Sequence, residues 1–376
     1  MTIDEAPSVG MVKTQTVRLI DPPDKLSLES GKSLTPIDVA YETYGTLNRD
    51  KSNAILLCHA LSGDAHAAGY HTKNDTKLGW WDRLVGPKKA FDTDHYFVIC
   101  TNFLGGCKGT TGPNSINPQT NQPYGLDFPV ITVSDMVNLQ KRFIDHLGIP
   151  RLKAVTGGSL GGMQAMEWAI QYPEMIENAI VIAAAAHVTA QGIAFHEIGR
   201  HAIVSDPQWQ QGNYNPKVPP KEGLSIARMV GHITYLSDYS FNTRFGRRLQ
   251  DKDKFDYNFS KEFQVESYLH YKGSSFVKRF DANTYLYISK TMDYFDLEGK
   301  YGSLKKAFEK VKAKFLILSF TSDWLFPTRQ SKDLVNALLA NDKHVSFIEV
   351  ETDYGHDAFL LEGEKLKALI ERFLIT

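Results

Sequence analysis

Val155-Thr156-Gly157-Gly158-Ser159-Leu160-Gly161-Gly162-Met163-Gln164 is the stretch that decides the fold. At its centre, Gly157-x-Ser159-x-Gly161 has the spacing of a nucleophile elbow, a sharp turn between a strand and a helix. The serine in such a turn adopts a strained backbone, and its neighbours two residues away must lack bulk for the chain to pass. The turn lifts the Ser159 hydroxyl clear of the sheet and points the N-terminus of the following helix at the reacting centre. The stretch therefore predicts a reactive serine.

The residues on both sides of the elbow fit this interpretation. Leu152 to Val155 is a short apolar run with a β-branched residue, which favours a strand. Apolar residues then recur at helical spacing from Met163 to Ile170, until Tyr172-Pro173 ends the run. A strand before the serine and a helix after it are what the elbow requires.

Composition excludes several classes of protein. The 376 residues are 42% hydrophobic and 23% charged, with a net charge of −1, so neither nucleic acid nor an anionic membrane is expected as a partner. No apolar segment approaches the ~20 residues of a membrane span. The first residues are acidic and no apolar signal region follows them. Three cysteines, Cys58, Cys100 and Cys107, form no CxxC pair. We expect a cytoplasmic protein without disulfides.

Further apolar runs predict the strands of a sheet. Two early runs are joined by turn-rich sequence and predict an antiparallel start, while later runs are apolar on both faces, which is typical of strands covered by helices on each side. The predicted strands are 16–20, 37–44, 54–59, 96–100, 152–155, 179–186, 315–319 and 345–350. Predicted helices are 133–147, 331–339 and 362–374. This alternation predicts an α/β fold with a mostly parallel, doubly wound sheet.

The segment 187–297 has a different character. Strand-like runs stop there, aromatic residues become frequent, and residues 225–236, 261–271 and 283–295 have helical spacing. We interpret 187–297 as a helical lid inserted into an α/β core made of residues 1–186 and 298–376. A long loop rich in Gly, Asn and Pro, residues 102–129, is also expected to be functional because compact domains seldom keep such loops.

A reactive serine needs a base, and the base needs an acid that holds it in one tautomer. In proteins with this elbow the chain order is serine, acid, histidine. His356 follows the last predicted strand, in a loop that Gly355 allows to turn, and Asp323 follows the strand before it. Asp353 is the alternative acid, but it lies only three residues from His356. We predict Ser159, Asp323 and His356 as the catalytic residues, because side chains at the carboxyl ends of strands can meet.

Two backbone N–H groups are expected to form an oxyanion hole. Leu160 supplies the first by its position after the serine, and Leu61, in the loop after an early strand, supplies the second. No metal site is predicted. His196-Glu197-x-x-x-His201 resembles the zinc motif HExxH, but five residues of helix separate the two imidazoles by about 140°.

The chain resembles the homoserine O-acetyltransferase family of the α/β-hydrolase superfamily. Five motifs carry the resemblance in order: His59-Ala60-Leu61-Ser62-Gly63, the loop 102–113, Gly157 to Gln164, Ser322-Asp323-x-Leu325-Phe326-Pro327 and Gly355-His356-Asp357-x-Phe359-Leu360. The resemblance implies transfer of an acetyl group from acetyl-CoA to the hydroxyl of L-homoserine, through an acyl-serine, on the route to methionine. It also implies a homodimer formed through the helical lid, and no cofactor besides the co-substrate acetyl-CoA.

The resemblance also assigns the amino-acid end of the substrate. An arginine in the first lid helix binds the homoserine carboxylate in that family, and this position falls on Arg228. Tyr235 lies seven residues further, within ~20° of the same helical face, and a guanidinium suits a carboxylate bidentately. Asp357 matches the family residue that holds the substrate ammonium.

Three other functions remain open at this stage. Succinyl-transferring relatives share the same motifs, and no residue excludes a succinyl donor. An esterase or lipase would use the same three residues, with water in place of an alcohol. A binding protein without catalysis is disfavoured because Ser159, Asp323 and His356 are all intact.

Overall fold

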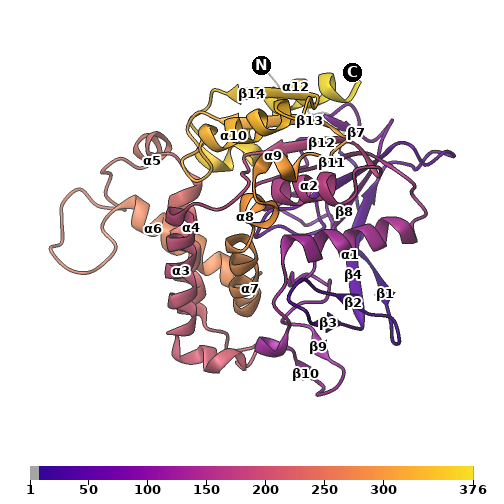
Figure 1. Ribbon diagram of the computed structural model, residues 1–376. Helices are drawn as coiled ribbons and strands as arrows, with labels where there is room; N and C mark the ends of the chain where they lie inside the picture. The colour runs from indigo at the N-terminus through magenta and orange to yellow at the C-terminus, as the bar shows by residue number, and fades with distance from the viewer. Residues whose placement is uncertain (1–7, 376) are drawn as a thin grey trace.

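The computed structural model describes residues 8–375, and its centre is an eight-stranded sheet (Figure 1). The strand order is β1-β4-β8-β5-β11-β12-β13-β14. β4 pairs antiparallel with β1 and with β8, and every later neighbour is parallel. The strands are β1 Gln15–Ile20, β4 Ile37–Tyr44, β5 Ala54–Cys58, β8 Phe97–Thr101, β11 Leu152–Gly158, β12 Ile176–Ile182, β13 Lys314–Phe320 and β14 Val345–Val350. The predicted mostly parallel α/β sheet with an antiparallel start is confirmed.

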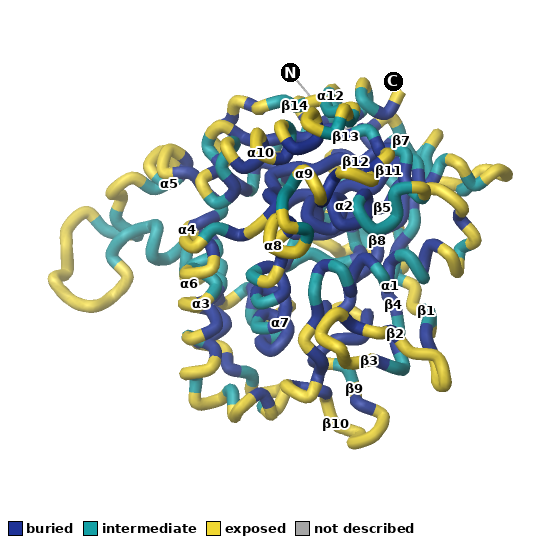
Figure 2. The backbone as a smooth tube through the Cα atoms, in the orientation of Figure 1, coloured by how far each residue is buried: buried dark blue, intermediate teal, exposed yellow. Residues whose placement is uncertain are grey.

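The central strands are buried on both faces, as their continuous apolar sequences require. In β5, Ala54, Leu56 and Cys58 face one hydrophobic core, whereas Ile55 and Leu57 face the other. β12 and β13 alternate in the same way. Figure 2 shows these strands as the buried centre of the molecule, under more exposed helices and loops.

Helices cover the sheet on both faces. α1, α2 and α10 contribute to the first core and α12 to the second. α1 begins at a capping box formed by Thr132 and Asp135, which satisfies two backbone donors of its first turn. These helices are α1 Val133–His146, α2 Leu160–Gln171, α8 Leu297–Tyr301, α9 Leu304–Ala307, α10 Thr328–Leu339, α11 Ala358–Leu361 and α12 Gly363–Ile375.

The loops contain several short strands and 3-10 helices. They are the strand pairs β2 Leu26–Ser27 with β3 Ser33–Leu34, β6 Val85–Gly86 with β7 Phe91–Asp92, and β9 Ile116–Asn117 with β10 Gln122–Pro123, and the 3-10 helices η1 Gly125–Asp127 and η3 Gly355–Asp357. β9, β10 and η1 lie within the long loop 102–129, which is otherwise irregular.

Residues 187–297 are helical, with long connections. They contain α3 Ala190–Val204, η2 Pro207–Gly212, α4 Lys221–Tyr235, α5 Asp238–Arg244, α6 Gln264–Val277 and α7 Ala282–Asp293. α4 packs between α3 and α6, and the connection from α5 to α6 extends far from the sheet (Figure 1). We call this segment the lid below. Its division from the core stays our interpretation of the sequence.

Two details of the sequence analysis were wrong. The predicted strand 179–186 runs instead from Ile176 to Ile182, because Ala183 has a positive φ of 47° that ends the strand, while polar residues disguised its beginning. α3 was not predicted, so Arg228 lies on the second long helix of the lid rather than the first. Among the described residues, no helix is both long and apolar enough to cross a membrane.

Candidate active site

Ser159 occupies a strained turn between β11 and α2. Its backbone has φ 58° and ψ −123°, a conformation that residues with a side chain rarely adopt. Gly157 and Gly161 make the turn possible, because a Cβ at either position would lie 2.3 or 2.0 Å from the carbonyl oxygen of Cys58 at the end of β5. The glycines thus let the elbow pack directly against the neighbouring strand. Ser159 itself is only 6% exposed.

His356 and Asp323 form the pair that the sequence predicted. Nδ1 of His356 lies 2.8 Å from Oδ2 of Asp323, and both side chains are buried. The other carboxylate oxygen of Asp323 accepts hydrogen bonds from the backbone N–H groups of Leu325 at 3.0 Å and Phe326 at 2.9 Å. Asp353 is exposed and presents its backbone carbonyl to the Ser237 hydroxyl. Asp323, not Asp353, is therefore the acid in position to orient the imidazole.

Two opposing effects act on the imidazole of His356. Burial lowers the pKa of His356, but the negative charge of Asp323 and its hydrogen bond outweigh burial, so the pKa is raised above its ordinary value. A base of this kind has an increased affinity for a proton, which suits a group that must take one from a hydroxyl.

Phe359 joins the histidine loop to the elbow. A Cβ on Gly158 would lie 2.2 Å from ring carbon Cδ2 of Phe359, so the ring rests on the bare backbone beside Ser159. The same ring lies 5.5 Å from the imidazole of His356, centroid to centroid. Trp81 donates a hydrogen bond from Nε1 to the Phe359 carbonyl at 2.8 Å. Ser159 and His356 are thereby held in one packed unit although about 200 residues separate them.

Leu160 is the first residue of α2, directly after Ser159, and Leu61 lies three residues after the end of β5. Within residues 8–375, neither backbone N–H donates to a protein acceptor. The N–H of Leu160 is also one of the free donors at a helix N-terminus, where partial positive charge collects. The N–H of Leu160 is therefore free for an oxyanion formed at Ser159, and the role of Leu61 stays a prediction from the sequence.

A buried polar chain holds the loop that carries Leu61. Nε2 of Gln164 donates to the His59 carbonyl at 3.3 Å, and its Oε1 accepts from Gln140 at 2.8 Å. Trp168 donates to Gln140 at 2.8 Å. Burial lowers the pKa of His59, whose Nδ1 lies 2.9 Å from the Ala60 carbonyl and whose Nε2 accepts from the N–H of Phe103. Sequence reasoning missed this chain, because nothing in the spacing of the two glutamines predicts that they meet.

Arg228 faces the same loop from the lid. Its Nη1 lies 3.2 Å from the Ser62 hydroxyl, and its guanidinium stacks near the rings of Tyr235 at 5.4 Å and Phe276 at 4.6 Å. The ring of Tyr235 lies 6.2 Å from that of His356. The contact between Arg228 and Tyr235 confirms the prediction that the two residues share one helical face. Arg279 was missed: its Nη1 donates to the Ser62 carbonyl at 2.9 Å.

Asp357 carries a carboxyl group beside these cations. Burial raises the pKa of Asp357, while the charges of His356, Arg228 and Lys272 act in the opposite direction without cancelling the effect of burial. Asp357 and Arg228 are thus opposite charges near enough to act on each other. An α-amino acid carries the matching pair, an ammonium and a carboxylate.

The Cys107 thiol and a cluster of two histidines with a glutamate are less suited to act as a nucleophile or as a metal site. Burial raises the pKa of the Cys107 thiol to about 11, which keeps it protonated and poorly nucleophilic. Glu42, His66 and His71 place possible metal ligands within 4.8 Å of one another. Their N–O separations, 3.0 Å to His66 and 2.7 Å to His71, are hydrogen-bond lengths, shorter than the ~3.3 Å between ligands of a tetrahedral zinc ion. We interpret this cluster as the carboxylate of Glu42 held by hydrogen bonds to two histidines, not as a metal site.

Comparisons with known proteins agree with this geometry. A family model described as alpha/beta hydrolase fold matches residues 53–363. A homoserine O-acetyltransferase of Methanohalobium evestigatum is 57% identical over 98% of this chain and 74% of its own length. That of Deferribacter desulfuricans is 55% identical over 98% of this chain and 96% of its own. The chain belongs to the homoserine O-acetyltransferase family.

Solved structures place this family member among both transferases and hydrolases. The crystal structure of homoserine O-acetyltransferase from Bacillus anthracis matches with a TM-score of 0.90 and 33% identity, covering 97% of this chain and 98% of that one. Esterase E22 matches with a TM-score of 0.88 and 32% identity, covering 97% and 100%. Proteins of this fold thus include both transferases and esterases. The residues around Ser159 must decide whether an alcohol or water accepts the acyl group.

Proposed function

We propose that the chain transfers an acetyl group from acetyl-CoA to the hydroxyl of L-homoserine and so serves methionine biosynthesis. The observation that carries the proposal is the joining of the Ser159 elbow, the His356–Asp323 pair and the opposite charges of Arg228 and Asp357 in one site of a family member. The first two groups suit acyl transfer, and the last suits an amino acid as the acceptor.

The first half-reaction acylates the serine. Nε2 of His356 takes the Ser159 proton while Oγ attacks the thioester carbonyl carbon. The N–H groups of Leu61 and Leu160 stabilise the oxyanion. When the carbonyl re-forms, the C–S bond breaks and His356 returns the proton to the leaving thiolate. The products are acetyl-Ser159 and free CoA, with no cofactor required.

The second half-reaction repeats these steps with an alcohol. Arg228 binds the homoserine carboxylate and Asp357 its ammonium, and the γ-hydroxyl is directed at acetyl-Ser159. His356 takes the hydroxyl proton, the alkoxide attacks the acetyl carbon, and the collapsing intermediate returns the proton to Ser159. Tyr235 forms part of the wall between Arg228 and His356. The two half-reactions together give a ping-pong kinetic mechanism.

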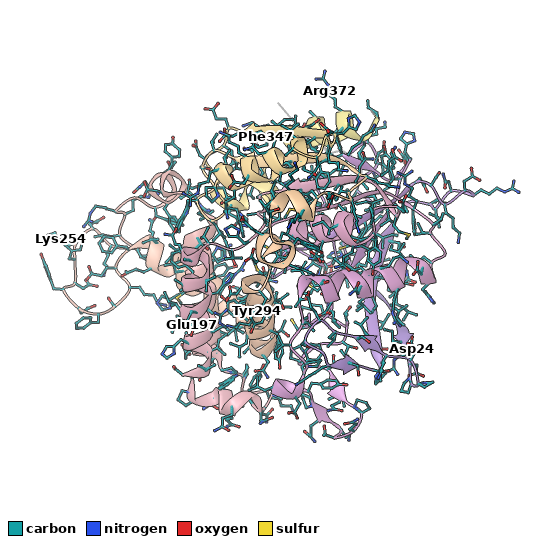
Figure 3. The ribbon with its side chains drawn as sticks, in the orientation of Figure 1. Asp24, Glu197, Lys254, Tyr294, Phe347 and Arg372 are labelled. Carbon is teal, nitrogen blue, oxygen red and sulfur yellow. The ribbon has the colours of Figure 1, made fainter. Side chains whose placement is uncertain are left out.

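We also propose a cytoplasmic homodimer that forms through the lid. The connection between α5 and α6 projects into solvent, as the position of Lys254 shows (Figure 3). It carries three exposed aromatic residues, Phe255, Tyr257 and Phe259, the last two almost fully exposed. Exposed aromatic clusters mark protein interfaces. Sedimentation of the wild type and of a variant with all three changed to serine tests the proposal, and a dimeric triple variant contradicts this interface.

Thiol release and intact mass together separate the proposed transferase from the alternatives. Thiol release from acetyl-CoA should be rapid with homoserine and slow without it. Intact mass after acetyl-CoA alone should show one acetyl group on the wild type and none on Ser159→Ala. Equal thiol release with and without homoserine would identify an esterase-like hydrolase, which the likeness to esterase E22 makes the second candidate. Faster turnover with succinyl-CoA would assign the succinyl reaction instead.

A further inference from the structure

The seam between α4 and α6 carries more positive charge than the amino-acid substrate needs. Two pairs of cations gather around it, from α4, α5, α6 and the segment just after α6, and each pair contacts one aromatic ring. Arg228 and Arg279 lie 4.6 and 5.1 Å from the ring of Phe276. Arg244 and Lys272 lie 5.3 and 5.5 Å from the ring of Tyr268. We call these the inner pair and the outer pair.

A chain of side-chain contacts links the two pairs. The inner pair contacts Ser62, next to Leu61. Tyr268 connects the outer pair to it, because its hydroxyl lies 3.1 Å from Nδ1 of His232, whose ring in turn lies 5.7 Å from that of Tyr235. Tyr268 and Phe276 are eight positions apart, which separates the pairs by about 12 Å along α6.

These cations lack acidic partners. Elsewhere in the chain, cations pair closely with carboxylates: the buried Arg200 lies 2.7 Å from Asp293, and Lys300 lies 3.0 Å from Glu167. Within residues 8–375, none of the four cations of the seam lies within 4.0 Å of a carboxylate oxygen. Burial and the combined charges of the four lower the pKa of His232 to about 2. The imidazole between the pairs is therefore neutral and adds no further charge.

The net charge of this group favours an anion as its ligand. Lys77 adds a fifth positive charge near Lys272, and the carboxylates that act on the group are Asp64 and Asp357. Homoserine is a zwitterion, so binding it leaves the excess of positive charge unchanged. Mutual repulsion among unpaired cations costs stability unless an anion binds.

We propose that Arg244 and Lys272 bind a phosphate group of the acyl donor. This inference rests on the proposed function, in which the donor is a thioester of a phosphate-bearing carrier. With the acyl carbon at Ser159, the phosphates lie at the far end of the carrier's flexible arm. The outer pair sits at the far end of the seam from Ser62, and its cations project beside an aromatic face that the arm can follow.

The test compares donors with and without phosphate. Lys272→Gln and Arg244→Gln should each raise KM for acetyl-CoA about tenfold, the loss of one charge-assisted contact. The KM for S-acetyl-N-acetylcysteamine, the same thioester without phosphates, should change less than twofold, and so should the KM for homoserine. Lys272→Arg and Arg244→Lys should recover most of the affinity. Lys290→Gln is the matched control, since Lys290 makes a similar contact, 5.4 Å from the ring of Tyr294, on α7.

A binding measurement keeps the test independent of turnover. Calorimetry with free CoA should give about a tenfold weaker Kd for each outer-pair variant, and 3′-dephospho-CoA separates the terminal phosphate from the diphosphate. Equal effects on the phosphate-free thioester, or none beyond those of Lys290→Gln, would overturn the inference. A loss seen only with succinyl-CoA would assign these cations to the acyl carboxylate instead. If the wild type bound CoA through these residues but transferred no acyl group, the proposed function would fail and the phosphate site would stand.

Discussion

The ring of Phe359 lies on the bare backbone of Gly158, one residue before Ser159. Any side chain at position 158 would place its Cβ 2.2 Å from that ring. Because Phe359 also packs against His356, this contact sets the distance between the elbow and the base.

Gly158→Ala should therefore impair stability and activity together. Displacing the ring should cost roughly 1–3 kcal/mol of unfolding free energy, typical of an overpacked core. Denaturant unfolding and kcat with acetyl-CoA and homoserine provide the two measurements. Gly363→Ala is the control, because its Cβ would meet Arg83 only at an ordinary 3.5 Å. The double change Gly158→Ala with Phe359→Leu should regain part of the stability. A fully stable and active Gly158→Ala would refute this account of the contact.

His356 and Asp323 should behave as one unit. His356→Ala should lower kcat roughly 10⁴-fold, and adding Asp323→Asn should make it little worse, because each acts through the other. Asp353→Asn should remain close to wild type, since that side chain is exposed. Multiplying losses in the double variant would show that Asp323 acts elsewhere.

Arg228→Ala should separate the two half-reactions. Acylation by acetyl-CoA does not involve the homoserine carboxylate, so a burst of about one CoA per site should persist. The second step should lose roughly 30-fold to several thousand-fold in kcat/KM for homoserine, the range for a lost bidentate contact. Arg228→Lys should recover only part, because an ammonium lacks the planar fork. Loss of the burst would mean that Arg228 acts through Ser62 on the oxyanion loop.

The pH dependence of acylation should report His356. The imidazole must be neutral to accept the serine proton, and Asp323 raises its pKa. The acidic limb of kcat/KM for acetyl-CoA should therefore have its midpoint above about 6.5. In Asp323→Asn, His356 stays buried but loses the negative charge that raises its pKa. The midpoint of the acidic limb, measured on the residual activity, should therefore move to lower pH. A limb that stays in place would contradict the assignment.

Glu42 should make stability depend on pH. Burial raises the pKa of Glu42, but hydrogen bonds from His66, His71, Thr14 and Tyr44 outweigh burial and lower it. A carboxyl with a depressed pKa in the folded state stabilises the protein above its unfolded pKa, and this contribution is lost as pH falls through the folded pKa. Thermal melts of Glu42→Gln should show a lower Tm at pH 7 and a smaller further decrease toward pH 4 than the wild type. Parallel curves would show that Glu42 does not cause the acid sensitivity.

The sequence predicted the parts of the molecule that local chemistry determines. A strand buried by helices on each side must be apolar on both faces, which located β5, β8 and β13 to within a few residues. The run 345–350 located the edge strand β14. The elbow needs glycine at two fixed positions. The serine–acid–histidine order of proteins with this elbow, together with the predicted strand ends, led to Asp323 and His356. Each of these features is written within a short stretch of chain.

Long-range packing could not be predicted in this way. Helical spacing shows which residues share a face, but not which neighbour that face meets. The resemblance indicated Arg228 and the spacing related Tyr235 to it, whereas Arg279 was missed. Arg244 and Lys272 come from different helices and meet only through Tyr268. Gln140 and Gln164 are similarly distant in sequence, and only the fold brings their amides together.

Gly355 ties the lid to the histidine loop. It has φ 70°, and a Cβ there would lie 2.6 Å from the backbone nitrogen of Ser237 and 2.7 Å from the carbonyl carbon of Leu236, just after α4. The end of the helix that carries Arg228 therefore rests on the residue before His356. A lid transplanted from a hydrolase such as esterase E22 would meet a loop shaped for another partner. A chimera designed to change the acyl acceptor should therefore exchange residues 352–357 together with the lid, because the two segments pack as one unit.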